Sequence, residues 1–305
     1  MLALFILPAL LGAAFLVNVF EDDDDDDASV PDAIKDLDPE NAYPTVQTII
    51  NDTSLIENLL IDRSDNVIVG TGDDDDISGS QAGDLIYGTA DDDSISALEG
   101  SDIVLGGQGN DTIDLGAGDD FVLPDIGENN LDYSNLSGND VIRGGDGDDI
   151  IGDLLGKNRL VGNQGDDVLV AIDAPNIDPY YYNDAESGTS DTLIGGAGTD
   201  LLVGDDGDVM AGGLGSDIFV ALDDEDQTGA DAFAEVRITD FNTEEDYLML
   251  LHVKGAIESD VELTFDDKIN AVRASYEDRP VAILEGLTAA DISKIQSIAV
   301  SWDQA

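Results

Sequence analysis

The chain has 305 residues, with 69 Asp and Glu against 11 Lys and Arg, which gives a formal net charge of −58 at pH 7. This charge argues against binding to nucleic acid or to an anionic membrane surface, and it favours cations as partners. The absence of cysteine excludes disulfides, thiolate metal sites and cysteine nucleophiles.

Residues 1–20 are apolar apart from Asn18, and the segment is long enough to cross a bilayer as a helix. It has no basic start, and cleavage at the small residues 12–14 would leave Phe15 and Phe20 at the mature end. These features favour an uncleaved hydrophobic anchor. A cleaved signal segment and a buried core segment are the alternatives.

Residues 21–45 are interpreted as an acidic linker, because Glu21 and six consecutive Asp precede a polar stretch that contains proline. In residues 46–65, apolar residues return at a spacing near that of a helix, and Ser54 with Glu57 forms a capping box. We predict that residues 46–61 form a short helix that acts as a lid over one end or face of the next unit.

A nine-residue pattern, Gly-Gly-x-Gly-x-Asp-x-apolar-x, recurs from Gly70 to Val220 in fifteen units. The sixth position holds Asp75, Asp84, Asp93, Asp102, Asp111, Asp120, Asn129, Asp140, Asp149, Asn158, Asp167, Asp191, Asp200, Asp208 and Asp217. The eighth position holds Ile77, Ile86, Ile95, Val104, Ile113, Val122, Leu131, Ile142, Ile151, Leu160, Leu169, Leu193, Leu202, Met210 and Phe219. A fixed period with one apolar residue per unit is typical of a solenoid, in which stacking builds the core.

Each unit is expected to form one very short strand, in which the eighth residue points inward and its neighbours point outward. The glycines before it allow a turn in which backbone carbonyl groups converge. Converging carbonyl oxygens together with a carboxylate suit a hard cation with six to eight oxygen ligands.

With these motifs, residues 66–220 resemble the RTX, or haemolysin-type, calcium-binding repeat family. The resemblance implies an all-β fold, a parallel β-roll of about fifteen units, with several calcium ions as cofactors. Each ion would lie between same-side loops two units apart, so that the facing pairs are Asp75 with Asp93, Asp84 with Asp102, Asp93 with Asp111, Asp102 with Asp120, and Asp149 with Asp167. The implied metal-binding residues are Asp75, Asp84, Asp93, Asp102, Asp111, Asp120, Asp140, Asp149, Asp167, Asp191, Asp200, Asp208 and Asp217, with the loop glycines Gly106, Gly107, Gly109, Gly144, Gly145, Gly147, Gly162, Gly165, Gly195, Gly196, Gly198, Gly212, Gly213 and Gly215.

Several units depart from the pattern, and their sites are expected to be weaker or empty. Asp73, Ala82 and Asp91 replace the fourth-position glycine, and Asn129 and Asn158 replace the sixth-position Asp. Residues 171–190 form an insertion, predicted as a protruding loop, that carries Tyr180, Tyr181 and Tyr182. Two residues are also inserted before Asp140, and one is lost before Asp208.

The outward positions seven and nine predict one apolar outer face and one polar outer face. In the first half the apolar residues are Leu85, Tyr87, Ile103, Leu105, Phe121 and Leu123, in even-numbered units; in the second half they are Val168, Val170, Leu201, Val203, Ile218 and Val220, in odd-numbered units. The alternation of units between the sheets therefore predicts that the apolar set changes faces near Asp140. Such a patch requires cover, from residues 46–61, from the C-terminal unit or from a second copy of the chain.

Residues 221–305 lack the repeat and are predicted to be a β-rich unit that caps the roll, with strands near 234–241, 246–253, 261–265, 271–276 and 280–284 and a helix near 289–295. The stretch from Ile238 to Leu248 resembles the segment that commonly follows RTX repeats. The only histidine, His252, lies in an apolar run and is interpreted as a packed strand residue.

The predicted function is a non-enzymatic, calcium-binding, exported or cell-surface protein. A zinc protease is excluded by the single histidine, and there is no nucleophile elbow of the Gly-x-Ser-x-Gly kind. Two alternatives stay open: an adhesin or matrix protein that binds a partner through the tyrosine loop or the apolar face, and a small secreted hydrolase that uses the C-terminal unit. Without calcium, the Gly- and Asp-rich tract is expected to be disordered.

Overall fold

The computed structural model describes residues 66–122, 138–153, 156–172, 190–205, 207–223, 234–252, 261–276 and 279–301. The predictions for the anchor, the acidic linker and the helical lid lie outside these residues. So do the predictions for the unit around Asn129 and for the tyrosine loop.

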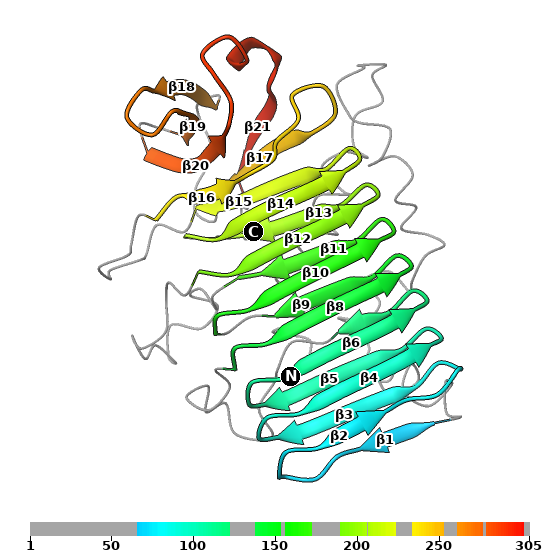
Figure 1. The fold of residues 1–305 in the computed structure, drawn as a ribbon. Helices are drawn as coiled ribbons and strands as arrows, with labels where there is room; N and C mark the ends of the chain where they lie inside the picture. Colours follow the sequence, from blue (N-terminus) through cyan, green and yellow to red (C-terminus); the bar gives the residue numbers. More distant parts are fainter. Residues whose placement is uncertain are drawn as a thin grey trace.

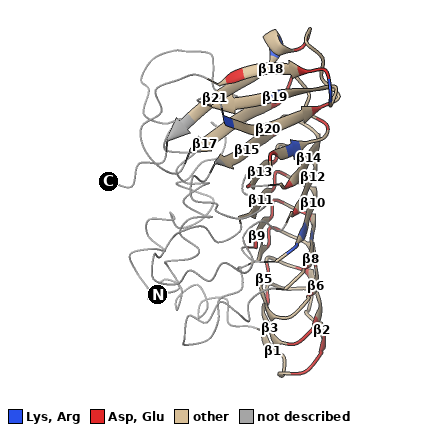
Figure 2. Ribbon diagram, turned by 90° about the vertical axis from the view of Figure 1, so that its left-hand side faces the viewer, with Lys and Arg blue, Asp and Glu red and all other residues tan. Residues whose placement is uncertain are grey.

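Two sheets of mainly parallel strands lie back to back along the roll (Figures 1 and 2). In spatial order, sheet A contains β1 (Val67–Val69), β3 (Leu85–Ala90), β5 (Ile103–Gln108), β7 (Phe121–Val122), β9 (Ile150–Asp153), β11 (Val168–Ala171), β13 (Leu201–Gly204), β15 (Ile218–Asp223), β17 (Tyr247–His252) and β21 (Gln296–Ser301). Sheet B contains β2 (Asp76–Ser78), β4 (Ser94–Glu99), β6 (Thr112–Ala117), β8 (Val141–Asp146), β10 (Arg159–Gln164), β12 (Thr192–Ala197), β14 (Val209–Leu214), β16 (Val236–Ile238), β20 (Arg279–Glu285), β19 (Ala271–Tyr276) and β18 (Glu262–Asp266). Successive repeat strands alternate between the sheets, which confirms the predicted all-β parallel roll.

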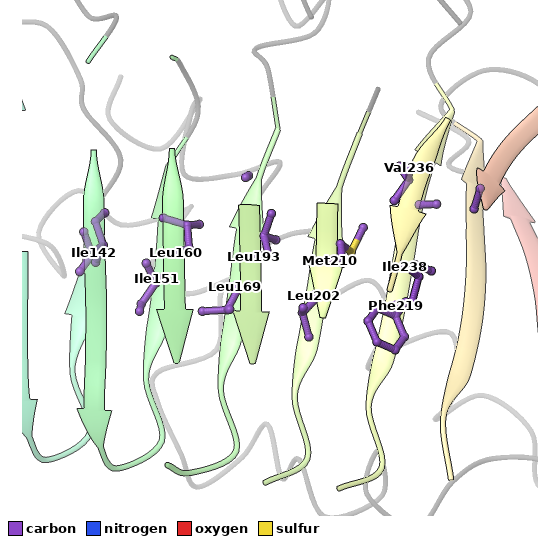
Figure 3. Close-up of a cluster of buried hydrophobic side chains, with 14 of the residues drawn as sticks. Ile142, Ile151, Leu160, Leu169, Leu193, Leu202, Met210, Phe219, Val236 and Ile238 are labelled. Atoms are coloured by element: carbon purple, nitrogen blue, oxygen red, sulfur yellow. The ribbon is translucent and has the colours of Figure 1, made fainter. Parts of the chain in front are cut away.

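The core is a line of eighth-position side chains that meet between the sheets. Figure 3 shows Ile142, Leu160 and Leu193 from sheet B facing Ile151 and Leu169 from sheet A. All the described eighth-position residues lie in one buried cluster, from Ile77 to Phe219. A single side chain per strand is enough here because each one packs against those of the coils before and after it.

The repeat strands on the two sides of residues 124–132 pair directly with each other. Strand β6 pairs directly with β8, and β7 pairs directly with β9. The next coil after Asp111 and Asp120 is therefore the one that carries Asp140 and Asp149.

This pairing corrects the predicted change of apolar face. Because β6 pairs with β8 and β7 pairs with β9, the apolar sets before and after residues 123–137 both lie on sheet A, in β3, β5, β7, β11, β13 and β15. The register places Ile103 beside Phe121, and Val170 beside Val203. One continuous apolar outer face therefore follows the whole roll.

In the second half of the roll this outer face of sheet A is largely buried, although its side chains point away from the core between the sheets. In the first half Leu85, Tyr87, Leu105 and Phe121 are half-buried. Val203 and Val220 are 1% and 0% exposed, and Ile103, Leu201 and Ile218 are each 5% exposed. On the outer side of sheet B, Thr112, Asp114 and Arg159 are exposed, and Val141, Val161 and Ile194 are half-buried. The two sheets therefore have different surroundings on their outer sides, as the side-chain pattern requires.

The five strands predicted after the repeats are present as β16 to β20. Strands β16 and β17 pair with the last repeat strands, β14 and β15, so they continue the two sheets. Strand β17 prolongs the apolar face of sheet A instead of covering it. Strands β18 to β20 are antiparallel to one another. The chain then returns to sheet A, where β21 pairs with β17.

The predicted helix at 289–295 is wrong in type and length. The structure has a single 3₁₀ turn, η2 (Ile292–Lys294), preceded by Thr288, whose backbone N–H donates to Asp291 Oδ2 at 3.1 Å. The turn is short because the chain must become extended at Gln296, where β21 begins beside β17.

We expect Val203→Ser to lower the free energy of unfolding in saturating calcium by about 2 kcal/mol, because it places a hydroxyl group on a buried apolar surface. Val161 occupies the same ninth position on sheet B and is half-buried, so Val161→Ser is the matched control and should cost about 0.5 kcal/mol. Chemical denaturation followed by circular dichroism measures both. Equal losses would show that the face of sheet A has no special cover.

Candidate metal sites

The sixth-position residues form two columns, one along each edge of the roll. Column I precedes the strands of sheet B and contains Asp75, Asp93, Asp111, Asp140, Asn158, Asp191 and Asp208. Column II precedes the strands of sheet A and contains Asp84, Asp102, Asp120, Asp149, Asp167, Asp200, Asp217 and Asp246. The edge that carries each column is called edge I or edge II below.

Within each column, one carboxylate oxygen joins neighbouring coils. The backbone N–H of Asp84 donates to Oδ1 of Asp102 at 2.7 Å, and that of Asp149 donates to Oδ1 of Asp167 at 2.9 Å. The other three pairs expected from the resemblance are joined in the same way: Asp75 with Asp93, Asp93 with Asp111, and Asp102 with Asp120.

The same bond crosses the interruptions of the repeat. The N–H of Asp111 donates to Asp140 Oδ1 at 2.7 Å across 29 residues, and the N–H of Asp167 donates to Asp200 Oδ1 at 2.9 Å across 33 residues. The columns are therefore continuous in space although the spacing in sequence is not.

The second oxygen, Oδ2, is different in the middle of the roll. In Asp93, Asp111, Asp149, Asp167 and Asp200 it is buried and accepts no hydrogen bond, and these side chains are at most 3% exposed. A buried ionised oxygen without a donor is costly, so each of these atoms needs a proton or a cation beside it.

The first-position glycine brings a carbonyl oxygen to the same place. A methyl group on Gly162 would overlap Oδ2 of Asp167 and lie 2.7 Å from the carbonyl oxygen of Gly195 in the next coil. A methyl group on Gly195 would likewise overlap Oδ2 of Asp200 and lie 2.6 Å from the carbonyl oxygen of Gly212. The glycine therefore keeps open a space where a carboxylate oxygen and a carbonyl oxygen converge.

The fourth-position glycines allow the loops to stack. Gly147, Gly165 and Gly198 have φ angles of 139°, 130° and 148°, and a methyl group on any of them would collide with the carbonyl group of the equivalent residue in the preceding coil. Asp91, one of the predicted departures from glycine, adopts the same left-handed region at φ 67°. The loop geometry is thus kept there at the cost of local strain.

Burial raises the pKa of several carboxyl groups in the middle of the columns from the ordinary value of 3.8. The pKa is about 8 for Asp149 and Asp200, and about 7 for Asp111, with neighbouring carboxylates adding to the rise and the backbone N–H bond opposing it. Burial also raises the pKa of Asp167 and Asp217, to about 6. Without a cation, several of these groups hold a proton near neutral pH.

The donor set fits calcium. All the converging atoms are oxygens, from Asp carboxylates and backbone carbonyl groups, which is the chemistry that calcium prefers. Among the described residues there is no group of three or more His, Cys, Asp or Glu side chains placed to hold a metal ion. The carbonyl oxygens beside the loop glycines, such as that of Gly195 near Gly162, belong to the same donor set.

Asp246, after the last unit, was missed by the sequence pattern, and Asn66 lies just before its first unit. Asp246 extends column II, because its Oδ1 accepts the N–H of Asp217 at 3.0 Å and Leu248, two residues later, is fully buried. Its loop has no glycine, and only the order Asp, Tyr, Leu repeats the pattern. Before the first unit, Asn66 precedes β1 in the same relation, and its carbonyl group accepts the N–H of Leu85 at 3.0 Å.

At the ends of the roll, Oδ2 finds a donor in its own loop. It accepts the backbone N–H of Thr71 in Asp75, of Ser80 in Asp84 and of Asn242 in Asp246, at 2.6, 2.5 and 2.7 Å. These terminal carboxylates are held by the protein itself. The oxygens without a donor are confined to the coils between them.

A family model of the RTX calcium-binding nonapeptide repeat matches residues 62–95, 87–122, 96–131, 136–152, 153–171 and 187–219. The chain is therefore an RTX repeat protein over this region, with a calcium-binding repeat structure. The comparison with curated proteins found no match.

Among solved structures, the chain is similar to an extracellular lipase, LipA from Serratia marcescens, with 19% identity and a TM-score of 0.22. The match covers 73% of this chain and 39% of the lipase chain, so this chain spans well under half of that protein. At this TM-score the likeness carries no argument about activity. Within the described ranges, no helix is long and apolar enough to span a membrane, and residues 1–20 lie outside those ranges.

We expect Gly162→Ala to weaken calcium binding several-fold and to raise the calcium concentration needed for folding, because the added methyl group fills the space between Asp167 Oδ2 and the next coil. Gly72→Ala is the control, since a methyl group there has no atom within 4 Å. Calorimetric titration with calcium compares the two variants. If both behave as the unaltered chain does, the space beside Gly162 is not an ion site.

Calcium affinity should rise between pH 6 and pH 8, the range of the raised pKa values, because the ion must displace protons from Asp149, Asp167 and Asp200. The stability of the calcium-free fold depends on pH in the opposite direction. A raised pKa stabilises that fold below pH 3.8, and this contribution is lost as the pH rises through 6 to 8. Titrations in two buffers with different heats of ionisation would count the released protons. Binding without proton release at pH 6 would contradict the assignment.

Proposed function

We propose that this chain is an exported or cell-surface calcium-binding protein whose repeat region folds when it binds extracellular calcium, and that its role is structural or binding. The observation that carries this proposal is the set of buried Oδ2 atoms without a hydrogen bond, in Asp93, Asp111, Asp149, Asp167 and Asp200. Each lies where a cation would replace a proton.

The charge of the repeat region supports folding coupled to metal binding. Residues 66–220 contain 34 Asp and Glu against three basic residues, Arg143, Lys157 and Arg159. The fold stacks many of these acids in two lines, with adjacent column members joined by direct hydrogen bonds. A ligand that binds only the folded state stabilises that state, so calcium should shift the equilibrium strongly toward the roll.

Export is supported by the weak affinity expected of such sites. Calcium modules of extracellular proteins bind with dissociation constants of about 10⁻⁴ to 10⁻³ M, and sites of this strength fill only where the ion is abundant. Residues 1–20, if they serve as an anchor, would hold the roll at the outer surface of a membrane. The roll would then stay unfolded inside the cell and fold outside it.

A structural or binding role is favoured over catalysis. The single histidine, His252, lies in strand β17 of the extended sheet A, and its backbone pairs with Asp223 and Ser301 on the two sides. The buried state of the apolar face favours an internal use of that surface over adhesion through it. An adhesin role would then depend on the tyrosine loop at residues 180–182.

We expect the full chain, purified in a chelator, to change from coil to β-structure in the millimolar range of calcium, with several ions bound per chain and little response to magnesium. Far-UV circular dichroism gives the transition and calorimetry gives the number of ions. A chain that is fully folded in the chelator, and indifferent to calcium, would overturn the proposal.

A further inference from the structure

The two columns differ in how the second carboxylate oxygen is satisfied. In column II, oxygens without a hydrogen bond are found well into the second half of the roll, at Asp149, Asp167 and Asp200. Their loops keep glycine at the fourth position, Gly147, Gly165 and Gly198, with φ between 130° and 148°. Edge II therefore presents the same open oxygen geometry coil after coil.

Column I has this geometry only in its first half, at Asp93 and Asp111. From Asp140 onward, the equivalent groups have partners within the protein. The Asp140 carboxyl group is hydrogen-bonded to the side chain of Asp153, which lies at a first position that glycine holds in most other units. Oδ2 of Asp208 accepts the backbone N–H of Asp205 at 2.9 Å.

Between these two positions, column I loses a carboxylate. Asn158 keeps the bond that joins the coils, because its Oδ1 accepts the N–H of Asp140 at 2.9 Å. Its remaining polar atom is an amide nitrogen, which is a donor and cannot be a calcium ligand. Asn158 thus maintains the stacking of the column without providing a second oxygen.

Fixed positive charges gather at the same place. Arg143, Lys157 and Arg159 are the only basic residues between 66 and 220, and two of them flank Asn158 directly. Strand β8, with Arg143, pairs with β10, in which Arg159 lies beside Val141 and Val161 lies beside Arg143. These exposed cations reduce the local negative potential in the part of the roll where column I lacks an open oxygen.

We propose that the two columns bind calcium unequally: column II binds ions in both halves of the roll, whereas column I binds them only before Asp140. The inference rests on the proposed calcium-dependent folding and adds which edge carries the ions. The second half of edge I is held by internal hydrogen bonds and basic side chains. Among the described residues there, the carboxyl groups of Asp140 and Asp208 already have hydrogen-bond partners, and the basic side chains make the local potential less negative.

Two matched pairs of substitutions test this proposal. Asp167→Asn and Asp140→Asn each keep an oxygen that can accept the N–H of the preceding coil, and each removes one carboxylate charge from a buried position. Asp200→Asn and Asp191→Asn form a second pair, in columns II and I respectively. Bound calcium per chain is measured by equilibrium dialysis at saturating calcium, together with the calcium midpoint of folding by circular dichroism.

We expect the column II variants to lose at least one bound ion and to shift the folding midpoint several-fold toward higher calcium, while the column I variants keep the number of bound ions of the unaltered chain. A loss of ions in Asp140→Asn or Asp191→Asn that equals the loss in the column II variants would overturn the proposal. Unchanged ion numbers in all four variants would also overturn it. If Asp140→Asn fails to fold, the pair at Asp191 and Asp200 decides the question.

The unaltered chain separates this proposal from the function on which it rests. If that chain binds no calcium, the proposed function itself fails, whatever the variants do. If it binds several ions and the variants of both columns lose them equally, the function holds and the inequality of the columns is wrong.

Discussion

The structure depends on one repeated contact, in which a buried Asp accepts the backbone N–H of the sixth-position residue one coil earlier. This contact sets the register of the strands, since it fixes which residue of one coil faces which residue of the next. It also requires loops that approach within hydrogen-bonding distance along the whole column, and a side chain on glycines such as Gly162 or Gly165 would collide with the neighbouring coil. The strands can be very short because the loops, as well as the core between the sheets, hold neighbouring coils together. The glycines, the Asp and the eighth-position apolar residue are thus parts of a single constraint.

Burying these carboxylates is electrostatically costly, and the coils differ in what stabilises the second carboxylate oxygen. At the ends of the columns, backbone N–H groups of the same loop satisfy the second oxygen of Asp75, Asp84 and Asp246. Around Asn158, a neutral amide and nearby basic residues replace an acid and an ion. In Asp93, Asp111, Asp149, Asp167 and Asp200 the second oxygen has neither. Burial raises the pKa to about 8 in Asp149 and Asp200 and to about 7 in Asp111. A divalent cation removes this cost more completely than a proton does, because it also satisfies the carbonyl oxygens beside it.

Much of the fold and of the two columns could be predicted from the sequence, because the nine-residue period and the residue types at its positions determine the local structure. The strands, the inward residues and the pairing of Asp84 with Asp102 follow from an eighteen-residue step that the chain keeps from Asp75 to Asp120. The coil count near residue 130 did not follow, because residues 124–132 fit the nonapeptide by spacing, yet β6 pairs directly with β8. Counting residues cannot show which segments enter the ladder. Asp246 was missed for a related reason: its loop, which begins at Phe241, keeps the Asp and the apolar residue without the glycines. The helix predicted near Ile292 is only a 3₁₀ turn in the structure. The pairing of β21 with β17 requires an extended chain just after it, and this pairing outweighs the local helical preference.

The interruptions show how a roll of this kind accommodates extra chain. Each longer connection in the repeat region leaves sheet A and returns to sheet B, after β7, β11 and β15, so all of them fall on edge I. Each also preserves whole coils: Asp111 still meets Asp140, and Asp167 still meets Asp200. An interruption that added a single strand would move every later strand into the opposite sheet. The apolar outer side chains of those strands would then lie on the polar outer face. Each connection therefore returns to the sheet that the repeat requires. As a result, one apolar face and one uninterrupted column of carboxylates run the length of the molecule. Edge II, which carries that column, has the short loops of the repeat. The variation in connection length is concentrated on edge I, where the ion-binding geometry is incomplete.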